Sequence, residues 1–148
     1  MEQVLIIKII DVMNLFHLAI PVSDLDTAND FYINVLGCSK GRSSSKWIDF
    51  NFYGHQLVCH EVKKSVNKDS NDVDGNNIPV PHFGIILEWN QFQKLSADLQ
   101  SKNINFIIEP TIRFKGQVGE QAIMFLKDPS NNAIEFKSFR NNDEIFKK

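Results

Sequence analysis

Two segments of this chain, one early and one past its middle, place a histidine inside the same apolar, strand-like pattern. They are FHLAI at 16–20 and HFGII at 82–86. After each segment, a helix signature and further short strand-like runs follow in the same order, so both halves read as strand, helix, strand, strand, strand. Because an internal repeat constrains a fold more than any single motif, the sequence predicts two copies of one βαβββ module.

Helix-terminating residues bound the helix expected in each half. In the first half, Ser23 or Asp24 is a suitable N-terminal cap, and Gly37 supplies the left-handed position at the C-terminus. In the second half, Asn90 is the expected cap. The strand-like runs that follow are joined at Gly54 in the first half and by the turn DPSNN, 128–132, in the second.

These boundaries divide the chain of 148 residues into one domain with flanking segments. The N-terminal run contains Lys8 and is too short to span a bilayer, and no small-residue cleavage site follows it, so we interpret it as an arm or extra strand. Met13 is an alternative first residue of the protein. The expected segments are this arm (1–13), a first module (14–62), a polar linker loop (63–79), a second module (80–140) and a C-terminal tail (141–148), with 14–140 forming the domain.

Charge and cysteine content exclude several classes of function. The net charge of −2 shows no excess of the positive charge that binds nucleic acid or an anionic membrane, so we expect neither as a partner. The two cysteines form no disulfide framework and no CxxC zinc motif, which favours a cytoplasmic protein in a reducing compartment.

Aligning the second half with the first pairs the two histidine strands and also the final strands of the two halves. The equivalent positions are then His17 with His82 and Val58 with Glu135. Three of these four are metal-ligand residue types. A buried, unpaired carboxylate costs several kcal/mol unless a cation accompanies it. The repeat therefore indicates a metal site, although a histidine in an apolar strand can equally be a satisfied core residue.

Four segments carry a resemblance to a known family: FHLAIPVSDLDTANDFYINVLGC, GHQLVCHE, PHFGIILEW and FLKDPSNNAIEFKSF. In these segments and in its repeated βαβββ order, the chain resembles the vicinal oxygen chelate superfamily, which includes glyoxalase I, fosfomycin-resistance proteins, bleomycin-resistance proteins and extradiol dioxygenases. Asn131 replaces the glycine of the family's Asp-Pro-x-Gly-Asn turn, and asparagine tolerates the positive φ required there. The resemblance implies an α+β fold of two paired βαβββ modules that form a curved mixed sheet around a central metal site.

The resemblance also implies a ligand set, which is His17, His82 and Glu135 in this sequence. Val58 occupies the fourth position and cannot bind metal, which argues against a glyoxalase I with four protein ligands. Two histidines and one carboxylate with open positions are typical of non-haem Fe(II) oxygenases. We therefore expect a divalent metal ion as cofactor, with Fe(II) favoured and Mn, Zn or Ni as alternatives.

The ligand set favours an extradiol-dioxygenase-like enzyme acting on a small molecule. The alternatives are a glyoxalase-type lyase or thiol transferase of the fosfomycin-resistance kind, and a non-enzymatic binder of the bleomycin-resistance kind. Relatives often pair modules across two chains, so a homodimer is expected.

Two residues are candidate acid/base groups beside the metal. His60 follows Val58 by two residues and therefore shares its strand face; the alternatives are a replacement metal ligand and a solvent-exposed histidine at a strand end. Tyr53 is the nearest hydroxyl in sequence that could help to deprotonate a catechol-like substrate.

Other residues are candidates for substrate binding. The glycine-containing segment 113–121 suggests a loop over the cavity mouth, where Arg113 and Lys115 would hold an anionic substrate and Gln121 would reach the metal-bound group. Trp47 and Phe125 would line an apolar pocket. The alternatives are solvated loop cations and ordinary core aromatics.

Overall fold

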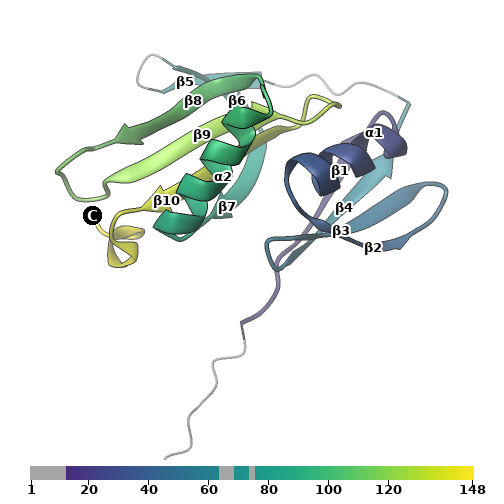
Figure 1. Cartoon of the computed structure of the whole chain (residues 1–148), viewed down its shortest axis with the longest axis horizontal. Coiled ribbons are helices and arrows are strands. Elements are labelled where there is room, and N and C mark those ends of the chain that lie inside the picture. Colours follow the sequence, from purple (N-terminus) through teal and green to yellow (C-terminus); the bar gives the residue numbers. More distant parts are fainter. Residues whose placement is uncertain (1–12, 64–68, 74–75) are drawn as a thin grey trace, which may run out of the picture.

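The computed structural model describes residues 13–63, 69–73 and 76–148 and contains two βαβββ modules side by side (Figure 1). Each module is a four-stranded mixed sheet with a helical segment on one face. The predicted α+β class and the paired modules are confirmed. The expected N-terminal arm lies outside the described residues, except for Met13.

Module 1 is a sheet in the order β1-β4-β3-β2, in which β1 runs parallel to β4. The βαβββ pattern requires strand β2, but the local sequence does not locate it, because all of its residues are exposed at the sheet edge and show no apolar alternation. The elements are β1 (His17–Val22), α1 (Leu25–Asp30) with the π-helical turn η1 (Phe31–Val35), β2 (Ser39–Ser43), β3 (Trp47–Phe52) and β4 (His55–Glu61).

Module 2 repeats this arrangement in the order β7-β10-β9-β8, in which β7 runs parallel to β10. A short 3₁₀ helix, η2 (Asn142–Glu144), follows in the expected tail. The elements of module 2 are β7 (His82–Ile86), α2 (Trp89–Ser101), β8 (Phe106–Arg113), β9 (Gln121–Lys127) and β10 (Ala133–Phe139).

The helix boundaries follow local side-chain chemistry. Asp24 caps α1 by accepting a hydrogen bond from the backbone of the first turn (2.7 Å), and this bond lowers the pKa of its carboxyl. Gly37 has a φ of +75°, as predicted for the helix end. The cap of α2 is Glu88 rather than the predicted Asn90, because the side chain of Gln91 accepts a hydrogen bond from the Glu88 backbone N–H (3.3 Å).

The segment 63–79, expected to be a linker loop, contains two strands where the structure describes it. These antiparallel strands, β5 (Asp69–Val73) and β6 (Asn76–Val80), pair with each other. Ile78 of β6 packs on Ile123 and Phe125, on the face of β9 opposite the core that contains α2. The polar composition of the segment gave no strand periodicity from which this pairing could be predicted.

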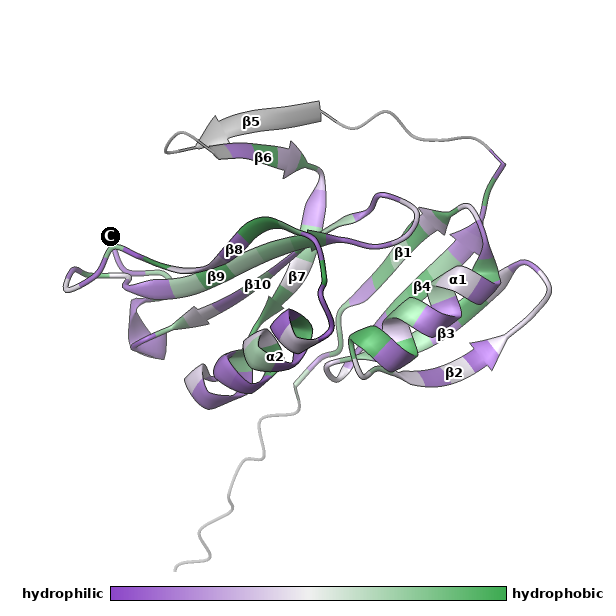
Figure 2. Ribbon diagram, turned by 45° about the horizontal axis from the view of Figure 1, so that its top comes forward, coloured by the Kyte–Doolittle hydropathy of each residue, from purple (hydrophilic) through white to green (hydrophobic). Residues whose placement is uncertain are grey.

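One apolar core extends through both modules between the sheets and their helices (Figure 2). Alternate residues of the central strands enter it, such as Phe50 and Phe52 from β3 and Phe136 from β10. Cys38 and Cys59 also lie in it, and burial raises the pKa of each thiol to about 12. Both cysteines therefore stay protonated at neutral pH and are poor metal ligands.

A buried polar network joins the modules where the DPSNN turn of module 2 meets module 1. The Tyr32 hydroxyl donates to an Asp128 carboxylate oxygen (2.9 Å), and Asn132 donates both to Asp128 (2.8 Å) and to the backbone oxygen of Pro21 (2.8 Å). Burial, followed by the negative charge of Asp128, raises the pKa of Tyr32 well above its usual value, so the hydroxyl remains a donor. Asn131 has the positive φ (70°) expected in this turn.

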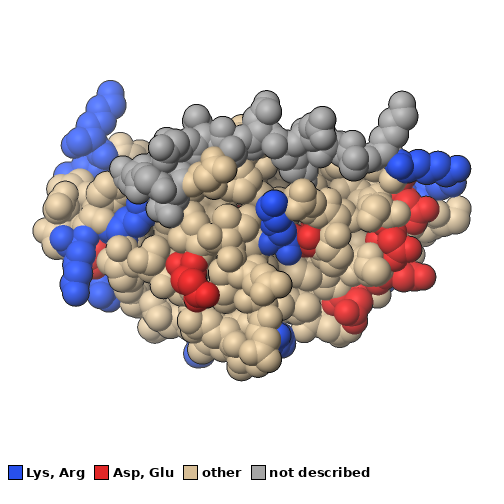
Figure 3. All heavy atoms as spheres, turned by 90° about the horizontal axis from the view of Figure 1, so that it is seen from above, with Lys and Arg blue, Asp and Glu red and all other residues tan. Residues whose placement is uncertain are grey.

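The surface shows no broad basic area in the view of Figure 3, where Lys and Arg side chains are scattered. Among the described residues, no helix is long and apolar enough to cross a membrane.

We expect Tyr32→Phe to lower the free energy of unfolding by about 1.5–3 kcal/mol, because it removes a buried hydrogen bond to a charged group. Tyr53→Phe is the matched control: its hydroxyl donates to the neutral backbone oxygen of Leu36 (2.9 Å), so the expected loss is about 0.5–1.5 kcal/mol. Urea denaturation measures both values. An equal or smaller loss for Tyr32→Phe would contradict the role of the Asp128 network.

Candidate metal centre

The parallel pairing of the first and last strand sets the same geometry in both modules. In module 1, Ala19 pairs with Val58; in module 2, Gly84 pairs with Glu135. Each of these first-strand residues follows the histidine of its strand by two positions. The register therefore makes Val58 and Glu135 equivalent, in agreement with the alignment of the two halves.

The half-site of module 2 consists of His82 and Glu135. His82 Nε2 lies 3.1 Å from Glu135 Oε2, and Lys137 Nζ lies 3.5 Å from the other carboxylate oxygen. The opposite ring nitrogen of His82, Nδ1, contacts the backbone oxygen of Pro79 (2.8 Å). The ring of Phe125 packs edge-to-face against the imidazole of His82, with the ring centroids 5.0 Å apart. This residue, predicted to line a substrate pocket, therefore contacts the proposed metal ligand.

The contact between His82 and Glu135 requires a positive charge. The backbone oxygen of Pro79 can only accept, so Nδ1 of His82 carries a proton. Nε2 then faces a carboxylate oxygen that is also an acceptor, and either a proton or a metal ion must lie between them. A divalent ion bound to both atoms at about 2.1 Å would hold them about 3–3.5 Å apart. The observed separation of 3.1 Å is compatible with a bound ion and also with an ordinary hydrogen bond.

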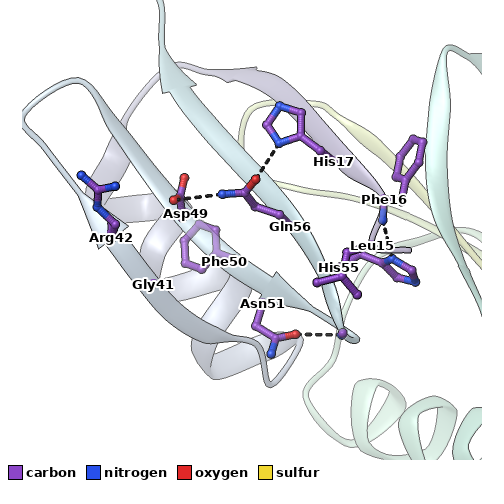
Figure 4. Close-up of a pocket in the computed structure, with 11 residues that line it drawn as sticks. Leu15, Phe16, His17, Gly41, Arg42, Asp49, Phe50, Asn51, His55 and Gln56 are labelled. Atoms are coloured by element: carbon purple, nitrogen blue, oxygen red, sulfur yellow. Dashed lines mark hydrogen bonds between the residues drawn. The ribbon is translucent and has the colours of Figure 1, made fainter. Parts of the chain in front are cut away.

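The half-site of module 1 is built around His17 (Figure 4). His17 Nδ1 lies 2.7 Å from Gln56 Oε1, and Gln56 Nε2 donates to Asp49 Oδ2 (3.2 Å). These side chains line a pocket of about 450 Å³, together with Arg42 from the edge strand β2. Beside it, His55 Nδ1 accepts the backbone N–H of Phe16 (2.9 Å) and so anchors the start of β1.

One chain does not assemble the predicted ligand set by itself. Among the described residues, no three His, Cys, Asp and Glu side chains are gathered closely enough to hold a metal ion. A smaller cavity of about 140 Å³ lies where the modules meet, lined by Leu18 and Gln56 of module 1 and by Phe83 and Gly84 of module 2. His17 and the His82–Glu135 pair are thus two separate half-sites.

The two predicted acid/base residues have different surroundings. Tyr53 packs against Phe52 and Phe136 and donates its hydroxyl to a backbone oxygen, and burial raises its pKa well above the usual value. It does not reach either half-site. His60 is exposed on the strand face shared with Val58, at the register position that Lys137 occupies in module 2.

Apart from Phe125, the predicted substrate-binding residues lie away from the His82–Glu135 pair. Gln121 pairs with Phe139, which lies four residues beyond Glu135, or roughly 13 Å along the strand. Gln121 is buried and donates to the backbone oxygen of Gly119 (3.2 Å).

The neighbouring loop cations and Trp47 also lie outside the half-sites. The Arg113 guanidinium lies over the ring of Phe114 (5.0 Å), and Lys115 is exposed. Trp47 is half-buried at the start of β3, paired with His60.

Four residues at the half-sites were not predicted from the sequence: Arg42, Asp49, Gln56 and Lys137. The sequence contains a signal for two of them. Gln56 lies two residues before Val58 and Lys137 two residues after Glu135, so each shares a strand face with that residue. Asp49 and Arg42 carry no comparable signal, since their role depends on how β2 and β3 align with β4.

Comparison with known proteins decides the family. The model of the Glyoxalase/Bleomycin resistance protein/Dioxygenase superfamily matches residues 14–136. This chain belongs to that superfamily. A glyoxalase/bleomycin resistance protein/dioxygenase from Alicyclobacillus acidocaldarius is 36% identical, with a TM-score of 0.76 over 90% of this chain and 96% of that chain. The predicted resemblance is confirmed.

Two further structures share the fold at lower identity. The fosfomycin resistance protein FosX from Listeria monocytogenes is 16% identical, with a TM-score of 0.62 over 90% of this chain and 98% of that chain. The lactoylglutathione lyase from Agrobacterium tumefaciens is 16% identical, with a TM-score of 0.59 over 84% of this chain and 92% of that chain. At this identity the likeness establishes the fold alone.

We expect Gly84→Ala to disrupt the half-site of module 2. The backbone oxygen of Glu135 lies so close to Gly84 that an added Cβ would overlap it, which should cost about 1–3 kcal/mol of unfolding free energy. Gly41→Ala is the control, because its Cβ would lie 3.3 Å from the Cβ of Asp49, a contact that small movements relieve. Urea denaturation measures both, and equal losses would contradict the close approach at Gly84.

Proposed function

We propose that this protein is a metal-dependent enzyme that acts on a small molecule carrying neighbouring oxygen atoms, with one divalent ion held by His17, His82 and Glu135. The observation that carries the proposal is the contact of His82 Nε2 with Glu135 Oε2, where either a proton or a metal ion must lie between two acceptor atoms. His17 presents a second imidazole at the equivalent position of module 1. Val58 leaves the fourth direction open to substrate.

We propose further that two copies of the chain complete the site as a homodimer. Within one chain the described residues do not bring three ligands together, whereas a twofold dimer can place His17 of one copy against His82 and Glu135 of the other. Exposed apolar side chains flank both half-sites, with Leu15 and Phe16 beside the first and Ile86 beside the second. Their burial between copies would supply association energy.

A bound divalent ion would supply Lewis-acid polarisation of the substrate oxygens. The residues of this chain bind and orient the substrate around it. Arg42 at the rim of the module 1 pocket would hold an anionic group, and Lys137 would compensate the charge of Glu135. We propose His60, which is exposed on the strand face shared with Val58 and lies four residues along β4 from Gln56, as the group that would accept or return a proton.

The site supports a lyase or transferase reaction best. Such chemistry needs the polarising ion and one proton-transfer group, for which His60 is the proposed residue. The extradiol dioxygenase favoured by the ligand set was expected to use Tyr53 as well. The Tyr53 hydroxyl instead donates a hydrogen bond to the backbone oxygen of Leu36 in the core. FosX and lactoylglutathione lyase, which share this fold, bear names that fit the lyase or transferase class.

An Fe(II) dioxygenase is the second candidate. The observation that favours it is the ligand set itself, since two histidines and one carboxylate are typical of non-haem Fe(II) oxygenases. The two candidates differ in the metal and in the need for O₂. A redox-inactive ion with O₂-independent turnover supports the first, and iron with O₂-dependent turnover supports the second.

We expect the protein purified without added metal to contain a stoichiometric divalent ion, and His17→Ala and Glu135→Ala to lose it. The reason is that each substitution removes one of three ligands. Elemental analysis measures the content, with Lys115→Ala as a control that should retain the parent content. A parent that neither contains nor takes up Mn, Fe, Ni or Zn would contradict the metalloenzyme proposal and leave a binding protein.

A mixing experiment tests the shared site. Neither His17→Ala nor Glu135→Ala homodimers contain a complete ligand set, but a hybrid dimer contains one, formed by His17 of one copy and Glu135 of the other. We expect hybrids, purified through two different affinity tags, to regain one ion per dimer. Hybrids that remain metal-free, beside a parent that binds metal, would place the whole site within one chain.

A further inference from the structure

We propose that Asp49 and Gln56 form a positioning relay that holds His17 with its proton on Nδ1 and its lone pair on Nε2, directed towards the metal position. The proposal rests on the role of His17 given above. The three residues come from adjacent strands, β3, β4 and β1, so the relay is part of the sheet (Figure 4). Asp49 and Gln56 are positioning residues, because they act through His17.

The direction of every hydrogen bond in the relay follows from donor and acceptor chemistry. An ionised carboxylate only accepts, so the amide nitrogen of Gln56 must face Asp49, and the amide oxygen must face His17. That oxygen also only accepts, so Nδ1 of His17 must donate across the 2.7 Å contact. The neutral imidazole is then left with its lone pair on Nε2, the atom needed for a metal bond.

Module 2 places a proton on Nδ1 of its histidine by a different route. There the backbone oxygen of Pro79, rather than a side chain, accepts from Nδ1 of His82, and Nε2 faces Glu135. His55 has the opposite arrangement, because its Nδ1 accepts the backbone N–H of Phe16 and its proton must reside on Nε2. Of these three histidines, the two proposed ligands therefore carry a proton on Nδ1 and His55 does not.

The relay matters because module 1 offers no backbone acceptor in its place among the hydrogen bonds of the described residues. Gln56 lies directly opposite His17 in the strand register, and the side chain of His17 is exposed. Without Gln56, water would replace the partner and either ring nitrogen could carry the proton. Loss of such a partner of a metal ligand typically costs 10–100-fold in metal affinity.

The experiment compares substitutions that remove, keep or release the relay. Gln56→Leu removes the acceptor, Gln56→Glu keeps an acceptor opposite Nδ1, and Asp49→Leu allows the Gln56 amide to rotate and present its nitrogen to His17. Gln93→Leu, the same chemical change at an exposed position of α2, is the matched control. The readout is long-range ¹H–¹⁵N NMR of the imidazole nitrogens in the metal-free protein, with His17 assigned by its absence from His17→Ala.

We expect the parent, Gln56→Glu and Gln93→Leu to show His17 protonated on Nδ1, and Gln56→Leu and Asp49→Leu to lose this fixed tautomer. His55, protonated on Nε2 in every variant, is the internal reference. Zn²⁺ competition with a chromophoric chelator should then give a dissociation constant about 10–100-fold higher for Gln56→Leu than for the parent. The Gln56→Glu value should stay nearest the parent.

Failure of the relay and failure of the metal proposal give different results. A parent in which His17 is protonated on Nε2, or a Gln56→Leu variant with an unchanged His17 tautomer, overturns the relay even when Zn²⁺ binds normally. A fixed Nδ1–H tautomer that Gln56→Leu abolishes, in a parent that binds no metal, supports the relay and overturns the metal site.

Discussion

The parallel pairing of the first and last strand of each module is the constraint on which the candidate site depends. A helix and two strands separate the paired strands in sequence, yet the pairing sets His17 directly beside Gln56 and Gly84 beside Glu135. A shift of one residue would turn Glu135 into the apolar core and Ile134 out of it. The close approach of Gly84 to the Glu135 backbone helps to specify this register, because a side chain there has no room.

The Asp128 network fixes the relation between the modules. Its carboxylate is buried, and it accepts hydrogen bonds from Tyr32, from Asn132 and from the backbone of its own turn. A buried carboxylate is tolerated only with such partners. Lys102 adds a second link, since its ammonium group donates to the backbone oxygen of Asn34 at the end of the module 1 helical segment (3.0 Å). Together with the shared core, these links hold the two half-sites in one fixed arrangement within the chain.

The two half-sites are related by the repeat but differ in charge. Module 2 supplies the carboxylate of Glu135, with Lys137 beside it, whereas module 1 supplies His17 with a neutral amide partner. In the proposed site, one half would therefore neutralise the ion while the other contributes an oriented, uncharged nitrogen. Val58, at the position equivalent to Glu135, adds no ligand or charge on the module 1 side. Arg42 contributes a cationic side chain to the lining of the module 1 pocket, which also contains His17.

Strand faces and the end of the first helix were predictable because they depend on neighbouring residues. The αL position of Gly37 and the turn at Asn131 follow from patterns a few residues long, whereas the equivalence of Val58 with Glu135 follows from the internal repeat. The pairing of β5 with β6 was missed, since Ile78 is held by contacts with β9 that its own segment does not encode.

What the sequence determined by itself was the repeated βαβββ module and the residues that each strand turns towards the candidate site. Alternation along a strand is local, so it decides the side of a sheet on which His17 or Glu135 lies. Only the tertiary structure decided which side chains meet there: Gln56 and Asp49 reach His17, Tyr53 turns into the core, and the half-sites remain apart. Those outcomes depend on the register of strands and the packing of modules, which bring together residues that are distant along the chain.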